Sequence, residues 1–261
     1  MQQALADFET SLDRIRALVK HVVANTGAAL SDPAIRGLHE TQQCGAVVLL
    51  TGYFEAFLKD LVRMFIDGLS RSGVTFGALP DSIRNGHFEG GGRVLTKASE
   101  AARKGRTTPF GNPTREDIVA RLHSAMSPPG SYQILWEAFA DTEANPGPEV
   151  VKGMAERLGL KNFWPTVSNK SGDPSRWAAT ALSSKLDDLI SKRNECAHTG
   201  KVSPVPTASE ILDYVDMLAA LAKGFVGALD DQLKSHSQHG GSVPTPSVAI
   251  QIPSKPGVVT P

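Results

Sequence analysis

The stretch CGAVVLLTGYFEAFLKDLVRMFIDGL, residues 44–69, decides the fold. Its apolar residues recur every three or four positions, as in a helix, and they cover most of the helix surface. Asp32 can cap this helix, and Pro33 suits its first position. The pattern predicts a long helix over about 34–71, at the centre of a bundle or at a dimer interface. Its main apolar stripe is Val47, Leu50, Phe54, Phe57, Leu58, Leu61, Phe65 and Leu69.

Three other segments have the same helical period. One begins at the N-terminus, with a stripe from Leu5 to Val22 that ends before Gly27. Another covers about 174–195 and is followed by Cys196-Ala197-His198-Thr199-Gly200, where Gly200 is a natural stop. The last covers about 208–234, and Thr207 and Glu210 form a capping box at its start. Together with the helix over 34–71 they predict an all-α fold of four substantial helices.

The chain between the second and third of these helices is irregular. Residues 72–175 alternate Gly-rich and Pro-rich stretches with short helical segments, expected at about 93–104, 114–126, 131–141 and 148–158. We therefore expect a domain over residues 1–235 in which 72–175 form an insert of short helices. Residues 236–261 are Pro-rich and lack a helical period, so they are expected to be a disordered tail. A strand-like pattern occurs within this tail, at 247–252.

Composition excludes several classes of protein. Lys plus Arg and Asp plus Glu both number 27, so the net charge is zero and any RNA-binding field must be local. The two cysteines, Cys44 and Cys196, lack the spacing of a zinc site, and we expect neither a metal nor a cofactor. The polar start and the lack of a long apolar run predict a cytoplasmic protein that does not enter membranes.

One run of polar residues at the end of an apolar helix could carry chemistry. It is Lys192-Arg193-Asn194-Glu195-Cys196-Ala197-His198. On an ideal helix Arg193 and His198 lie about 140° apart, so they converge only if the helix loosens or ends near Ala197. An ordinary helix cap, with His198 bonded to a backbone carbonyl, is the alternative interpretation.

RNA is the substrate for which such residues would suffice. Its 2′-hydroxyl is a built-in nucleophile, so cleavage needs a base, an acid and a cation for the phosphorane charge. His198 could act as base or acid near neutral pH, and Arg193 could contact phosphate oxygens with two hydrogen bonds. One histidine per chain is too few for both proton transfers, whereas two chains side by side would supply two.

The pattern Arg193-Asn194-x-x-Ala197-His198-x-Gly200, with GYFEAFLKDL at 52–61, resembles the HEPN superfamily. The resemblance is closest to the RiboL-PSP-HEPN branch, with MAE-type HEPN proteins as a near alternative. It implies a four-helix HEPN-like bundle with the irregular insert between helices two and three. It covers about 1–71 and 174–234, and leaves the insert and tail uninterpreted.

The resemblance also implies residue roles and partners. Arg193 and His198 would be the catalytic pair, in a homodimer formed across the face that carries them, with RNA as substrate. Asn194 would support them by a phosphate or backbone contact. Glu55 matches a position that sometimes reaches the motif, although an ion pair with Lys59 is an equal interpretation.

Two functions remain open at this stage. The first is a metal-independent endoribonuclease, a toxin or phage-defence effector with an antitoxin or defence-system partner. The second is a non-catalytic HEPN module that binds RNA, a nucleotide or a partner protein. A helical adaptor in which Arg193 and His198 are purely structural is a third interpretation.

Overall fold

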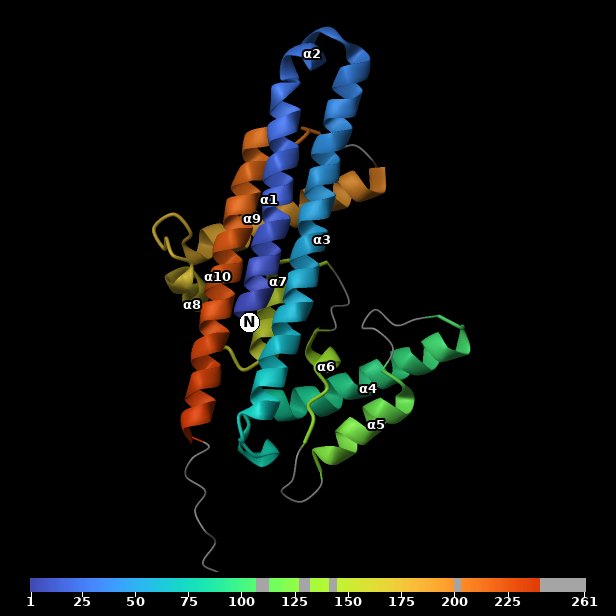
Figure 1. Cartoon of the computed structure of the whole chain (residues 1–261), viewed down its shortest axis with the longest axis vertical. Helices are drawn as coiled ribbons and strands as arrows, with labels where there is room; N and C mark the ends of the chain where they lie inside the picture. Colours follow the sequence, from blue (N-terminus) through green and yellow to red (C-terminus); the bar gives the residue numbers. More distant parts are fainter. Residues whose placement is uncertain (107–112, 127–131, 141–144, 200–202, 240–261) are drawn as a thin grey trace, which may run out of the picture.

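The computed structural model describes residues 1–106, 113–126, 132–140, 145–199 and 203–239. Throughout that part of the chain the regular structure is helical and no strand occurs, which confirms the expected all-α fold (Figure 1). None of the described helices has both the length and the apolar composition needed to cross a lipid bilayer.

The N-terminal helices form a long hairpin, visible at the top of Figure 1. Helix α1 (Gln2–Ala24) is joined through α2 (Thr26–Ser31) to α3 (Pro33–Arg71). The start of α3 is as predicted: Asp32 Oδ1 accepts a hydrogen bond from the Ala34 N–H at 2.8 Å, and Pro33 occupies the first turn. With 39 residues, α3 is about 58 Å long and can contact both ends of the molecule.

Helix α3 is the centre of the bundle, as its apolar pattern predicts. It packs against α1, α9 (Ala179–Thr199) and α10 (Ala208–His239). Its fully buried Phe54 and the Phe57 ring meet Phe8 of α1, with the Phe8 and Phe57 ring centres 4.7 Å apart. Burial of this continuous apolar surface is the main source of the bundle's stability.

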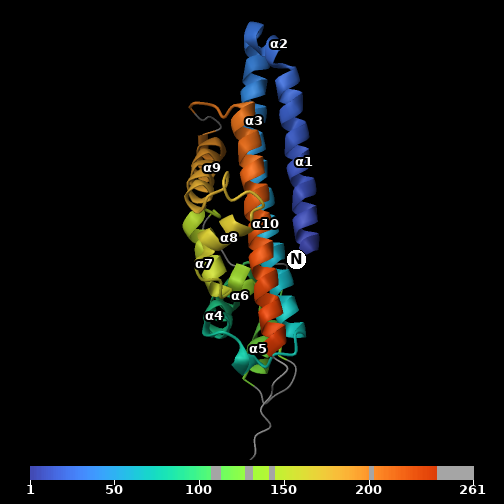
Figure 2. The ribbon, with the colours of Figure 1, turned by 90° about the vertical axis from the view of Figure 1, so that its left-hand side faces the viewer.

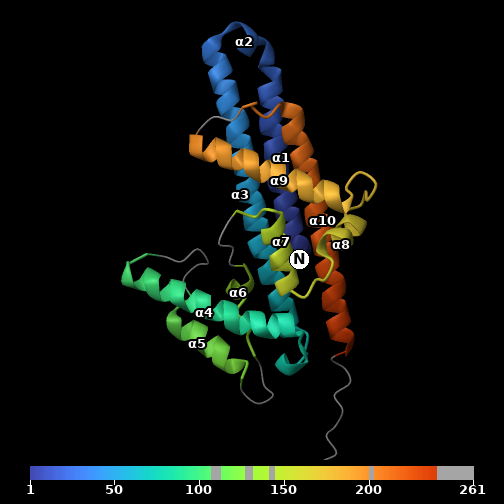
Figure 3. The ribbon, with the colours of Figure 1, turned by 180° about the vertical axis from the view of Figure 1, so that it is seen from behind.

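The fourth helix of the bundle differs in direction from the other three. Helices α1, α3 and α10 run side by side, whereas α9 lies obliquely across α3 and α10 (Figures 2 and 3). Helix α10 extends to His239, beyond the boundary at residue 235 expected from sequence. The rest of the expected tail, 240–261, with the strand-like pattern at 247–252, lies outside the described residues.

The insert is more helical than its sequence suggests. Its first long helix, α4, begins at Asp81 and not near residue 93, and an eight-residue helix at 163–170 was not predicted. Residues of the insert join the same buried core as the bundle, including Ile83, Ile118 and Phe139. The elements are η1 (Phe76–Ala78), α4 (Asp81–Arg103), α5 (Arg115–Ser124), α6 (Glu137–Ala140), α7 (Pro148–Arg157) and α8 (Phe163–Lys170).

Glycines in α4 explain why its first half was not predicted. Gly86 and Gly90–Gly92 are poor helix formers, but several of them face neighbouring elements at very short range. A Cβ added at Gly90 would lie 2.4 Å from the Ala138 carbonyl oxygen, whereas one added at Gly92 would meet no atom within 4 Å. The tertiary contact with α6 therefore overrides the low helix propensity of the segment.

This contrast gives a paired prediction for the stability of the insert. Gly92→Ala should stabilise the protein by about 0.5–1 kcal/mol, because alanine is the better helix former and the site is open. Gly90→Ala gains the same propensity but must push α6 away, so we expect a net loss of about 1–3 kcal/mol. Urea denaturation of both variants measures the difference, and stabilisation by Gly90→Ala would contradict the packing of α4 on α6.

The insert is also held by polar contacts. Buried His87 of α4 accepts, through Nδ1, a hydrogen bond from the Leu135 N–H at 3.1 Å. Tyr132 Oη donates to the Val74 carbonyl at 2.8 Å, and Arg121 lies 3.5 Å from the buried Glu137 carboxylate. Two buried titratable groups, His87 and Glu137, therefore take part in the contacts that hold the helices of the insert together.

Candidate active site on helix α9

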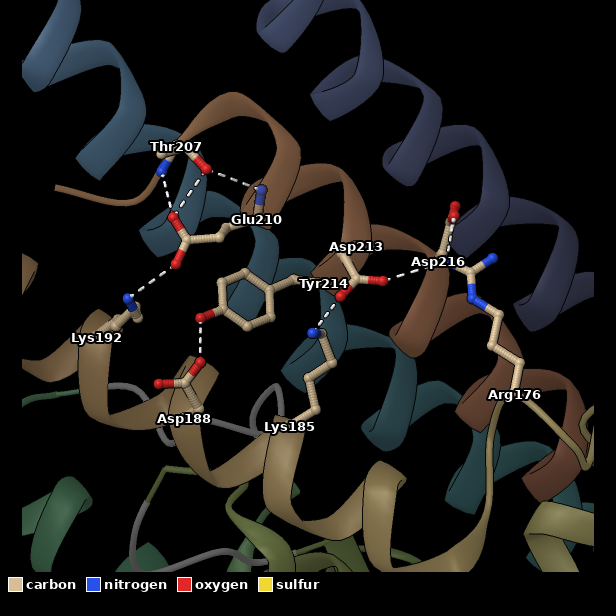
Figure 4. A network of polar contacts seen from close by, with 9 residues as sticks. All are labelled: Arg176, Lys185, Asp188, Lys192, Thr207, Glu210, Asp213, Tyr214 and Asp216. Carbon is tan, nitrogen blue, oxygen red and sulfur yellow. Dashed lines mark hydrogen bonds and ion pairs between the residues drawn. The ribbon is translucent and has the colours of Figure 1, made fainter. Parts of the chain in front are cut away.

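Helix α9 is fixed in place by charged side chains as well as by its apolar face. Lys185 forms an ion pair with Asp213 of α10, and Arg176, just before α9, lies 3.1 Å from Asp213 and 3.2 Å from Asp216 (Figure 4). Burial alone would raise the pKa of Asp213, but the two cations outweigh it and lower that pKa. We call this contact the α9–α10 seam.

A buried tyrosine continues the α9–α10 seam toward the end of α9. The Tyr214 hydroxyl donates a hydrogen bond to the Asp188 carboxylate (Figure 4). Burial, followed by the negative charge of Asp188, raises the pKa of Tyr214, so it remains a neutral donor. The bond fixes the rotation of α9 about its own axis one turn before the polar motif.

Glu210 completes the α9–α10 seam beside the motif. One carboxylate oxygen accepts from the Thr207 N–H and hydroxyl, both at 2.8 Å, while Thr207 Oγ1 accepts from the Glu210 N–H at 3.2 Å (Figure 4). This confirms the predicted capping box, and these bonds lower the pKa of Glu210. The other oxygen lies 3.4 Å from Lys192 Nζ. Lys192 is thus engaged in holding the two helices together.

Arg193 is placed differently from Lys192. Its guanidinium donates to Asn194 Oδ1 at 3.2 Å, and the same oxygen accepts from Asn145 Nδ2 at 2.7 Å. Within the described residues no carboxylate pairs with Arg193, which is half-buried. Asn145 comes from the insert, 49 positions away in sequence, and nothing in its local sequence indicates this contact.

His198 lies in the last turn of α9 and is exposed. The helix continues through Ala197 and ends at Thr199, so the whole segment from Arg193 to His198 is helical. A continuous helix keeps the Arg193 and His198 side chains about 140° apart, with Arg193 on the side that carries the buried leucines. One chain therefore brings together Arg193, Asn194 and Asn145, and does not bring His198 to them. The catalytic assignment of Arg193 and His198 stays a prediction.

Glu55 lies on α3, away from the end of α9. Its carboxylate is paired with Lys59 Nζ at 2.7 Å, the second of the two interpretations considered from sequence. The end of α9 contacts α3 at Cys44, eleven residues and about 16 Å along the helix from Glu55. A supporting role for Glu55 in the motif stays a prediction and would need a rearrangement of this pair.

The two cysteines meet where α9 crosses α3. Cys44 and Cys196 are both buried and pack together against Val48. Burial, and then the adjacent Cys44 thiol, raises the pKa of Cys196 to about 12. Among the described residues no group of three or more histidine, cysteine or acidic side chains is placed to hold a metal ion.

The raised pKa predicts low reactivity of the Cys196 thiol, because the thiolate is the nucleophile. Pulsed alkylation with iodoacetamide at pH 8, followed by peptide mass spectrometry, should modify Cys196 at least about a hundredfold more slowly in the native protein than in urea. Comparable rates in the two conditions would show that the α3–α9 contact is open in solution.

Comparison with known proteins agrees with the resemblance seen in the sequence. The family model described as RiboL-PSP-HEPN matches residues 9–235, which include the bundle, the insert and the Arg193 to His198 motif. Searches of curated proteins and of solved structures found no significant match. The matched region is most of the chain, so this protein belongs to the RiboL-PSP-HEPN family.

Proposed function

We propose that this protein is a metal-independent endoribonuclease of the HEPN type. Family membership supports it, since the matched region carries both residues of the Arg193 and His198 pair. The strongest structural support for the proposal is the set of contacts made by the Arg193 guanidinium. In the described structure its guanidinium is held by a neutral amide oxygen and is not neutralised by a carboxylate, so it can still bind an anion.

The proposed reaction is an internal phosphoryl transfer. The RNA 2′-hydroxyl attacks the adjacent phosphorus while a histidine removes its proton, and the bond to the leaving 5′-oxygen breaks as a second histidine donates a proton to it. Arg193 stabilises the charge on the pentacoordinate phosphorus. The products are a 2′,3′-cyclic phosphate and a 5′-hydroxyl, so no water is consumed in this step.

The reaction requires two copies of the chain, because one α9 directs His198 away from Arg193. We propose a homodimer in which two α9 ends share one groove. Leu38 and Leu49 of α3 are 58% and 47% exposed, and the added Cβ positions of Gly45 and Gly52 between and beside them are open. Leu49 follows Val48, which packs beside Cys196, so this apolar surface adjoins the end of α9.

Purified protein tests the proposal directly. Single-stranded RNA incubated with it in EDTA should be cut, with 2′,3′-cyclic phosphate ends identified by mass spectrometry. Light scattering should give twice the chain mass. A monomer that cleaves RNA would contradict the two-chain site, and intact RNA at micromolar protein would contradict the nuclease.

A non-catalytic module that binds RNA, a nucleotide or a partner protein is the second candidate. It is favoured by the separation of Arg193 and His198 on one continuous helix. It predicts saturable binding of RNA or a nucleotide that is weakened by Arg193→Ala, with no turnover by the wild-type protein.

The biological role that fits the nuclease is a cytoplasmic toxin or phage-defence effector, restrained by an antitoxin or defence-system partner. Expression of the wild-type chain alone should then arrest growth of a bacterial host, and the His198→Ala chain should not. Arrest by both chains would separate toxicity from the motif.

A further inference from the structure

The hydrogen bonds around Asn194 allow only one assignment of donors and acceptors. A guanidinium can donate and cannot accept, so the atom of Asn194 that faces Arg193 must be the amide oxygen. Asn145 must then donate from its Nδ2 to the same oxygen. Both lone pairs of Asn194 Oδ1 are thereby used, and its own NH₂ group is directed away from Arg193 and Asn145.

Asn145 lies in the insert just before α7. Its carbonyl accepts from the Gly147 N–H at 2.7 Å, and the intervening Pro146 is buried. Helix α7 begins at Pro148 and anchors this segment through Val151 and other core residues. The Asn145 side chain therefore reaches α9 from a backbone that is joined, on its C-terminal side, to a packed helix.

The hydrogen bond between Asn145 and Asn194 determines which donors of Asn194 and Arg193 face a ligand. With Oδ1 of Asn194 held by Asn145, Arg193 is restrained through one Nη atom, and among the described residues its other N–H groups make no hydrogen bond. The Asn194 NH₂ offers two further donors. A phosphodiester, with two unesterified oxygens, matches these guanidinium and amide donors.

We propose that Asn145 is a positioning residue for the RNA-cleaving site: it orients the Asn194 amide, and through it Arg193, toward the phosphodiester of bound RNA. The insert thus forms part of the site. This inference rests on the proposed ribonuclease function for its substrate, whereas the side-chain arrangement can be tested without it.

A double-mutant cycle tests the proposal by the coupling of two residues. Asn145→Ala should lower kcat/KM for RNA cleavage about three- to tenfold, the effect of one neutral hydrogen bond. In an Asn194→Ala background the same substitution should change nothing beyond about twofold, because Asn145 acts through Asn194. Asn169→Ala, in the exposed face of α8, is the matched control.

A charge variant separates positioning from simple stability. In Asn145→Asp the donor becomes a carboxylate, which would turn the Asn194 amide and attract the Arg193 guanidinium away from phosphate. We expect a loss of at least about tenfold, mainly as a higher KM, with cooperative unfolding retained. Cleavage by Asn145→Ala at the wild-type rate, or losses that multiply in the double variant, would overturn the proposal.

Nuclear magnetic resonance distinguishes failure of this inference from failure of the nuclease. Asn145→Ala should shift the Asn194 side-chain NH₂ and Arg193 Nε–H resonances, whether or not the protein cleaves RNA. If wild-type protein does not cleave, such shifts still support the orientation of Asn194 and Arg193 by Asn145, and unchanged resonances overturn it.

Discussion

His198→Ala should reduce RNA cleavage by a factor of about 10²–10⁴, the usual range for the loss of a general acid or base. Because His198 is exposed at the end of α9, its removal should leave the fold intact. Arg193→Ala should cost about 10²–10³ in kcat, because it removes the cation that we propose stabilises the phosphorane. Initial rates on a defined single-stranded RNA in EDTA measure both effects.

Matched variants exclude a general effect of losing surface charge. His21→Ala and Arg14→Ala remove a histidine and an arginine from the exposed face of α1 and should cleave at the wild-type rate. Circular dichroism and urea midpoints should be the same for all four proteins. Retained cleavage by His198→Ala would remove this residue from the proposed mechanism, and the proton transfers would then have to be assigned to other groups.

Acid should destabilise the insert through His87. Burial lowers the pKa of this imidazole from 6.5 to about 4, with the Arg121 carbonyl as a weaker opposing influence. The unfolded chain binds the proton at higher pH than the native protein does. The contribution of His87 is thus constant above pH 6.5 and falls as the pH drops toward 4, by about 3 kcal/mol in all.

Comparison with His87→Asn isolates this effect, because the asparagine amide oxygen can still accept the Leu135 N–H. The variant should be less stable at pH 7, where it loses contacts with the Phe76 and Phe88 rings. The gap between the two proteins should shrink by about 3 kcal/mol between pH 7 and pH 4. Urea denaturation at several pH values gives this gap, and parallel curves would show that the pKa of His87 is the same in the native and unfolded states.

The comparison with His87→Asn is necessary because Glu137 also makes the stability of the protein depend on pH. Burial raises its pKa, with Arg121 as a weaker opposing influence, so its ionisation costs stability as the pH rises above 4.5. Its contribution therefore has the opposite slope to that of His87. The difference between wild-type protein and His87→Asn cancels the Glu137 contribution, whereas the wild-type curve alone would not.

The bundle could be predicted from the sequence because its signals are local. Helix α3 is indicated by its own apolar period and by Asp32 and Pro33, and α10 by Thr207 and Glu210. Each pattern specifies a start, a buried face and a helix, without reference to distant residues. The family resemblance depends on the same kind of contiguous motif.

The insert could not be predicted in the same way, because distant contacts decide it. The glycines of α4 indicate a loop until Ala138 and Phe139 are known to pack on them. Pro165 within α8 and the short length of that helix likewise hide it from a search for periodicity. The site has the same limit: Arg193 and Asn194 stand out in the sequence, whereas Asn145 is joined to them only by the fold.

Glu210 has a consequence for how freely the chain beside the motif can vary. Glu210 pairs with Lys192 of α9 and caps the start of α10 through Thr207, so side-chain contacts hold the two helices together and the connection between them acts as a spacer. Doubling the length of such a spacer costs only about 0.6 kcal/mol in chain entropy. Sequence drift or insertion there should therefore leave the position of Arg193 unchanged.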